Sequence, residues 1–362
     1  MADLTAVSAY GRALCREIAM AAPRKRGNAL ETLYFGGGTP SLLPPSVLST
    51  ILDQVDAGHG LDAATEITLE VNPGTVDLDY LKAVRSLGVN RLSMGIQSFD
   101  EGRLKFLSRI HSVSQARRSI EQARQAGFDN LGLDLIYGLP GETKDQRRGE
   151  LDAVLNYDPE HLSCYMLTFE PGTPLGDACQ GNQFVPMDAE ALSRAFLDVS
   201  RYLENQGYRH YEISNFAREG NRWYSRHNSA YWQMVPYRGY GPAAHSLDVG
   251  ADGAWRRFWN LPDVGAYIRA LDAGEAPGRE VERLNRDQKI IEWIMVGLRT
   301  REGIDVADLN RRLNADFYSH FKVITRSLMD QGLARDRGGR FALTRAGWAR
   351  LDNIVESFYD SL

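Results

Sequence analysis

The first two-thirds of the chain alternates short β-branched or apolar runs with longer amphipathic runs, and this alternation restricts the fold more than any other feature. Such a rhythm predicts βαβ units and a parallel sheet. We expect strands at residues 32–35, 66–71, 91–95, 131–136 and 161–167, with helices at 45–55, 77–87, 112–126 and 144–156. The sequence therefore predicts an α/β fold built on a partial parallel (β/α) barrel. An open doubly wound sheet is the alternative, because periodicity alone does not show closure.

The rest of the chain predicts two further regions. A helix at 189–206 and a strand at 208–213 are the last elements of the partial barrel, which we expect over residues 1–214. Residues 215–284 form an aromatic-rich connecting region, of which 215–260 have the irregular pattern of a site-forming insertion. Residues 285–362 resemble an α+β winged-helix domain, with helices at 285–298, 306–313, 317–331 and 345–358 and a hairpin at 334–343.

Composition limits the environment and the partners. The net charge is −5, and no run approaches the ~18 consecutive apolar residues of a membrane span. Three scattered cysteines, Cys15, Cys164 and Cys179, suit a reducing cytoplasm better than a disulfide framework. Residues 284–362 carry 13 Lys and Arg against 11 Asp and Glu, which does not favour a nucleic-acid-binding face. We expect a cytoplasmic protein that is not integral to a membrane.

Polar residues stand at the ends of successive expected strands. The first strand runs into residues 36–40, GGGTP, whose glycines let backbone N–H groups approach a ligand. The next three strands carry Glu70, Gln97 and Asp134. Because parallel strands end at one edge, and because a buried carboxylate is costly unless it is paired or ligand-bound, we expect one shared rim with Arg109 nearby. These groups suit a ligand with an amine, a carboxylate and ribose hydroxyls.

Five motifs carry a family resemblance: GGGTPS, ExNP, GxQSF, the triplet Arg109-Ile110-His111 and LDLIYGLP. Their order and spacing are similar to those of the radical S-adenosylmethionine superfamily, in the branch of oxygen-independent coproporphyrinogen oxidase and the heme chaperone HemW. The resemblance covers nearly the whole chain and implies a TIM-like barrel. It implies no catalytic residue in this chain, and it places the S-adenosylmethionine contacts on Gly37, Gly38, Thr39, Glu70, Gln97, Arg109 and Asp134.

The resemblance also implies a [4Fe–4S] cluster, bound by CxxxCxxC in the loop after the first barrel strand. No such motif occurs here, and residues 2–21 resemble the helix that follows that loop. Either the true start lies upstream of Met1, or this is a member without a cluster. We favour the first explanation, because the retained cofactor contacts would otherwise have no purpose. The chain as given is expected to be inactive in radical chemistry.

Two segments separate the chaperone from the oxidase. Residues 166–171, MLTFEP, resemble the chaperone and not the NYAHxP-like segment of the oxidase. Residues 227–232, HNSAYW, resemble the HNxxYW motif of heme chaperones, which implies heme contacts at His227, Tyr231 and Trp232. An imidazole is a common axial ligand of heme iron, and aromatic rings offer a flat apolar face. A purely structural loop histidine is the alternative, and His245 is a second candidate ligand.

The implied function is that of a heme chaperone. It would bind heme and pass it to apo-proteins, respiratory ones among them, using S-adenosylmethionine and, in the full-length protein, the cluster. One alternative is coproporphyrinogen III oxidase or another radical enzyme of porphyrin metabolism. Another is a cluster-free nucleoside-binding protein. The sequence leaves open which apo-protein receives heme, whether the chain forms a homodimer, and whether S-adenosylmethionine is cleaved.

Overall fold

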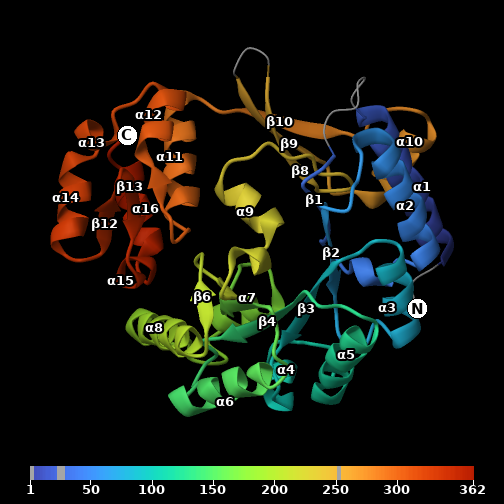
Figure 1. The fold of residues 1–362 in the computed structure, drawn as a ribbon, viewed down its shortest axis with the longest axis horizontal. Helices are drawn as coiled ribbons and strands as arrows, with labels where there is room; N and C mark the ends of the chain where they lie inside the picture. The colour runs from blue at the N-terminus through green and yellow to red at the C-terminus, as the bar shows by residue number, and fades with distance from the viewer. Residues whose placement is uncertain (1–3, 23–28, 251–253) are drawn as a thin grey trace.

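The computed structural model describes residues 4–22, 29–250 and 254–362, and its largest element is a seven-stranded sheet (Figure 1). The sheet order is β1-β2-β3-β4-β5-β7-β6, and the first five strands are parallel. Because these five strands follow one another in chain order, the sheet winds in one direction. A doubly wound sheet would reverse its order at a switch point. The strands are β1 (Thr32–Phe35), β2 (Glu66–Val71), β3 (Arg91–Gln97), β4 (Leu131–Tyr137), β5 (His161–Met166), β6 (Tyr208–His210) and β7 (Asn215–Arg218).

Helices lie between the parallel strands and cover the apolar face of the sheet. Leu69, Leu92, Leu133 and Leu162, one on each of β2 to β5, are fully buried in one core with the inward residues of these helices. The helices between the parallel strands are α2 (Pro45–His59), α3 (Leu78–Ser86), α4 (Glu101–Phe106), α5 (Val113–Gln125) and α6 (Lys144–Leu155). Helix α1 (Leu4–Ala21) precedes β1, and α7 (Pro174–Gln180) and α8 (Ala189–Asn205) follow β5. The sequence did not indicate α4 or α7, which are short helices inside loops.

The opposite face of the same strands is polar. Neighbouring partners in the register share a face, so Thr68 lies beside Arg91, and Asp134 lies beside Ser163. Arg91 is 2% exposed, although it begins a strand that is buried along its whole length. The interior side of the strands is therefore a polar surface that leads to the rim.

The connecting region is more regular than the sequence indicated. Residues 215–260, expected to be irregular, include β7, α9 (Arg226–Trp232), β8 (His245–Val249) and β9 (Trp255–Asn260), followed by α10 (Val264–Asp272) and β10 (Arg279–Arg283). Strands β10-β9-β8 form an antiparallel sheet in which Trp255 is buried against Trp293. The large aromatic side chains that suggested a loop are thus packed as strand residues. Strand β7 pairs with β5, so the barrel sheet extends past residue 214.

The C-terminal part has its own apolar core, built from helices and a small sheet of order β11-β13-β12. Two expected helices are interrupted: residues 317–331 break at Phe321, and residues 345–358 break near Arg350. Phe321 leaves the helical conformation while its buried ring packs between Phe317 and Phe358. The elements are α11 (Arg286–Gly297), β11 (Ile304–Asp305), α12 (Val306–Leu313), α13 (Phe317–His320), α14 (Lys322–Asp330), β12 (Ala334–Arg337), β13 (Arg340–Leu343), α15 (Arg345–Trp348) and α16 (Leu351–Tyr359). Across the described residues, no helix is both long and apolar enough to cross a membrane.

Candidate functional site

The glycine-rich loop follows β1 and contacts the end of β2. Gly37 and Gly38 are exposed and have φ angles of 75° and 54°, in the left-handed region that favours glycine. The Gly37 N–H donates to Glu70 Oε2 (3.2 Å), and the Tyr34 hydroxyl donates to Glu70 Oε1 (2.7 Å). Glu70 is therefore held between the loop and the interior of β1.

The next two predicted residues lie beside this loop. Thr39 Oγ1 accepts from Asn72 Nδ2 at 3.2 Å, which ties the loop to the residue after β2. Gln97 ends β3 at a register shift with a φ angle of 66°, and its side-chain Oε1 is buried without a hydrogen-bond partner. A Cβ on Gly95 would lie 2.8 Å from Gln97 Nε2, so a larger residue at position 95 would displace the amide from this position. An unpartnered buried acceptor at a bulge is a suitable contact for a ligand donor.

Asp134 occupies the interior face of β4. Ser93 Oγ lies within 3.5 Å of both carboxylate oxygens of Asp134. Burial raises the pKa of Asp134 to about 6, although Ser163 and the charge of Arg91 oppose this shift. Asp134 is thus half protonated near pH 6, whereas an exposed aspartate is almost fully ionised at that pH.

Arg109 lies beyond α4, on the wall of an open pocket of about 450 Å³ that Ile110 and His111 also line. Burial lowers the pKa of Arg109, and the charge of Asp134 opposes this shift, which shows that the two groups lie within electrostatic reach. His111 Nε2 donates to the carbonyl of Ile96 (3.1 Å) and fastens this segment to β3. The structure thus brings Gly37, Gly38, Thr39, Glu70 and Gln97 to the carboxyl ends of β1 to β3. Asp134 lies in the middle of β4, and Arg109 lies within its electrostatic reach.

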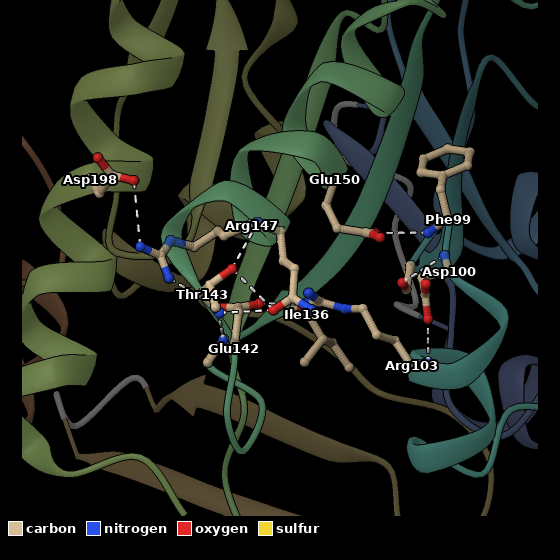
Figure 2. Close-up of polar contacts among 12 residues, drawn as sticks. Phe99, Asp100, Arg103, Ile136, Glu142, Thr143, Arg147, Glu150 and Asp198 are labelled. Carbon is tan, nitrogen blue, oxygen red and sulfur yellow. Dashed lines mark hydrogen bonds and ion pairs between the residues drawn. The ribbon is translucent and has the colours of Figure 1, made fainter.

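A buried ion network supports the α4 side of this rim (Figure 2). Glu142 accepts from Arg103 Nη2 (2.6 Å), from Arg147 Nη1 (3.0 Å) and from the N–H of Gly138 (2.9 Å). The Glu142 side chain is only 1% exposed. Arg103 belongs to α4, so Glu142 joins the helix that precedes Arg109 to the loop that follows β4.

The predicted heme contacts lie on α9, which packs against β1 near the start of β2. Glu66 accepts from the backbone N–H groups of Arg226 (3.2 Å) and His227 (3.1 Å), so a carboxylate fixes the N-terminus of α9. The His227 ring stacks on Tyr34 with a centroid distance of 4.6 Å and an interplanar angle of 17°. Its Nδ1 lies 3.0 Å from Thr32 Oγ1.

The second ring nitrogen of His227 is also engaged, because Nε2 lies 3.2 Å from the hydroxyl of Tyr231. Burial lowers the pKa of His227 to about 4, and the charge of Arg91 adds to this effect. The imidazole is therefore neutral at physiological pH, which is the form that binds iron. Trp232 is partly buried, and its indole Nε1 has no hydrogen-bond partner.

His245, the second candidate for heme, lies elsewhere. It begins β8, is exposed, and stacks on Trp259 with a centroid distance of 5.3 Å.

Comparison with known proteins shows the family to which the chain belongs. Residues 13–154 match the radical SAM superfamily model, and residues 284–350 match the HemN C-terminal domain. The heme chaperone HemW of Synechocystis is 36% identical over 84% of this chain and 72% of its own length. HemW of Bacillus subtilis is 30% identical over 98% of this chain and 92% of its own. The chain belongs to the HemW family of radical SAM proteins.

A solved structure confirms the fold class. Coproporphyrinogen III oxidase of Escherichia coli, a radical SAM enzyme, is similar over 100% of this chain and 85% of its own, with a TM-score of 0.79. Its sequence identity is 24%, so the likeness shows the fold alone. The seven rim residues lie inside the stretch that matches the radical SAM superfamily, whereas His227, Tyr231 and Trp232 lie between the two matched stretches.

Sequence reasoning missed three residues that connect this HemW-family site. Tyr34 joins Glu70 to His227, Glu66 holds α9, and Arg91 supplies the buried positive charge. Glu66 and Arg91 are charged residues at the first positions of buried strands, and Tyr34 alternates with apolar neighbours in β1. The sequence thus shows polar residues within buried strands, but it does not show their partners, because the partners are distant along the chain.

The cysteines do not form a cluster site in the part of the chain that the structure describes. Cys15 is on α1, Cys164 is buried on β5 and Cys179 is on α7, and all three are free thiols. No group of three or more His, Cys, Asp or Glu side chains that could hold a metal ion occurs among the described residues. The rim groups thus fit S-adenosylmethionine, whereas these thiols do not fit a [4Fe–4S] cluster.

Proposed function

We propose that the chain is a heme chaperone that binds heme beside α9 and S-adenosylmethionine at the strand rim, and delivers heme to apo-proteins in the cytoplasm. The observation that carries the proposal is the position of His227. Its neutral imidazole stacks on Tyr34, whose hydroxyl donates to Glu70 of the rim. Family membership supports the same assignment, because the curated relatives are heme chaperones.

Within this proposal, the rim residues hold the nucleoside ligand. Gly37 and Gly38 expose backbone groups, Glu70 and Asp134 accept from hydroxyls or an amine, and Gln97 offers its unpartnered Oε1. Arg109 lies where it would neutralise a ligand carboxylate. S-adenosylmethionine supplies radical chemistry in this superfamily only together with a cluster, so we assign these residues a binding role.

Heme bound here would offer iron to an imidazole nitrogen. Both ring nitrogens of His227 already have partners, Thr32 at Nδ1 and Tyr231 at Nε2. Ligation through Nε2 would replace the Tyr231 hydroxyl, leaving the Thr32 contact to keep the ring in orientation. Tyr231 and Trp232 would then lie beside the porphyrin, with the indole N–H of Trp232 still free to donate.

Heme titration tests the proposal. His227→Ala should weaken heme binding by about tenfold or more and shift the Soret band, because the axial nitrogen is removed. His245→Ala is the matched control, since His245 is an exposed histidine stacked on another aromatic ring. An unchanged heme titration for His227→Ala, or a loss of heme binding in His245→Ala alone, removes His227 from the proposal.

A second titration tests the rim and separates the alternatives. Gln97→Ala should weaken S-adenosylmethionine binding by about tenfold, whereas the exposed Gln125→Ala on α5 should not. Binding of S-adenosylmethionine without heme by the unchanged protein would favour a nucleoside-binding protein. Formation of protoporphyrinogen would favour the oxidase.

A further inference from the structure

A cavity of about 330 Å³ lies where the C-terminal domain meets α8, and none of its lining residues belongs to the rim or to α9. Arg301, Arg335 and Arg345 line it, and Leu343, Ala346 and Trp348 form an apolar wall. None of the described residues on its wall carries a carboxylate. The cavity therefore combines a concentrated positive charge with an apolar surface.

The three guanidinium groups are only partly neutralised. Glu204 of α8, which lies outside the wall, accepts from Arg301 Nη1 at 2.7 Å and pairs with Arg345. Arg335 donates to the backbone carbonyl of Arg301 (3.3 Å), which is a neutral partner. The three arginines and Glu204 thus leave an excess of two positive charges around the cavity.

Nearby groups do not remove this excess. Burial, followed by the charges of Arg337 and Arg301, lowers the pKa of Arg335, and Glu302 only partly opposes the shift. Glu302 is itself paired with Arg209 at 3.1 Å. Burial and then Arg201 lower the pKa of Arg345. Like charges thus repel one another in a partly desolvated position, which an anion would relieve.

We propose that this cavity binds the phosphate group of a small phosphate monoester. Such a group carries a charge of about −1.5 to −2 and three acceptor oxygens at neutral pH, which matches the excess charge and the three guanidinium forks. A carboxylate would leave one positive charge uncompensated. The cavity is larger than a phosphate group, and Leu343, Ala346 and Trp348 offer a surface for the organic part of the ester.

Calorimetric titration at fixed ionic strength tests this site with phenyl phosphate, inorganic phosphate and benzoate as probes. We expect saturable binding of one phenyl phosphate per chain, tighter than inorganic phosphate and at least about tenfold tighter than benzoate. Equal affinity for phenyl phosphate and inorganic phosphate would overturn the proposal that the ligand is an ester, and would assign the cavity to free phosphate. The absence of saturable binding, or equal affinity for benzoate, would overturn the site.

Two arginine variants of the hairpin formed by β12 and β13 test the site, one at a residue that lines the cavity and one at a residue that does not. Arg335→Gln should weaken phenyl phosphate binding by about tenfold. Arg340→Gln should leave it unchanged, because Arg340 lies on the same hairpin, pairs with Asp305 (3.3 Å) and does not line the cavity. Circular dichroism checks that each variant folds. If Arg335→Gln does not fold, Arg335→Lys keeps the charge without the fork and should weaken binding severalfold. Equal affinities for the Arg335 and Arg340 variants would refute the assignment.

Discussion

Replacement of Glu142 by glutamine tests whether the buried ion network in Figure 2 holds the α4 side of the rim in place. The Glu142 side chain is 1% exposed, and the side chains of its partners Arg103 and Arg147 are 13% and 7% exposed. Glutamine has nearly the same shape but no charge, and its amide NH₂ would face a donor. The change therefore removes the anion between two buried cations and places an amide donor against a guanidinium donor.

The expected loss follows from that burial. Removal of one partner from a buried ion pair costs about 3–5 kcal/mol, because the remaining charge is left uncompensated. Arg103 keeps the carbonyl of Ile136 (3.1 Å), and Arg147 keeps Asp198 (3.5 Å). We therefore expect the free energy of unfolding to fall by the lower end of this range, about 3 kcal/mol. This decrease corresponds to a fall of roughly 6–12 °C in Tm for a domain of this size.

Urea unfolding followed by far-ultraviolet circular dichroism measures this change. All six tryptophans lie after residue 214, so their fluorescence reports on the connecting region and the C-terminal domain and not on the barrel. Glu190→Gln is the matched control, since Glu190 forms an exposed pair with Arg194 and its loss should cost less than about 0.5 kcal/mol. A Glu142→Gln protein as stable as that control would refute the reasoning.

Three further predictions follow from buried ionisable groups. Glu17→Ala should lower the free energy of unfolding, measured in urea, by about 3 kcal/mol, because the Glu17 carboxylate accepts from Gly241 N, Asn260 Nδ2 and Tyr267 OH. A decrease below about 1 kcal/mol would contradict this. Asp134→Asn should stabilise the protein by on the order of 2 kcal/mol at about pH 7.5. The folded-state pKa of Asp134, about 6, lies above its ordinary value, so the unmodified protein loses stability as pH rises towards 6. The stability gained by Asp134→Asn should therefore be smaller at about pH 5 than at about pH 7.5. A gain that does not depend on pH would contradict this cause. Heme binding through His227 should stay constant from about pH 8 to pH 6 and fall only near pH 4, whereas a midpoint near 6.5 would show an exposed imidazole.

Much of the barrel could be predicted from the chain, because its signals are local. The five parallel strands began where expected, since each is an apolar run bounded by turn residues. Gly37, Gly38, Glu70, Gln97 and Asp134 could be selected because each follows or interrupts such a run. Strand ends in a parallel sheet meet at one edge, so their positions along the chain already implied a shared rim.

The connecting region was predicted less well, because its pattern is decided by contacts between distant segments. Trp255 is a core residue because side chains that are distant along the chain, Trp293 of α11 among them, pack in the same cluster. The helix of residues 317–331 breaks at Phe321, where burial of one ring outweighs local helical preference.

The sequence by itself determined the order of strands and helices, the glycine-rich loop and the family, since these depend on residue type and spacing along the chain. Only the tertiary structure placed His227 on Tyr34, two residues separated by 193 positions, and set Glu66 beneath α9. It also brought three arginines together on the wall of a cavity that no local pattern marks. The physical reason is that charge and burial at these sites arise from groups that meet only when the chain has folded, so that neither the neutral state of His227 nor the excess charge at Arg335 is encoded in any short segment.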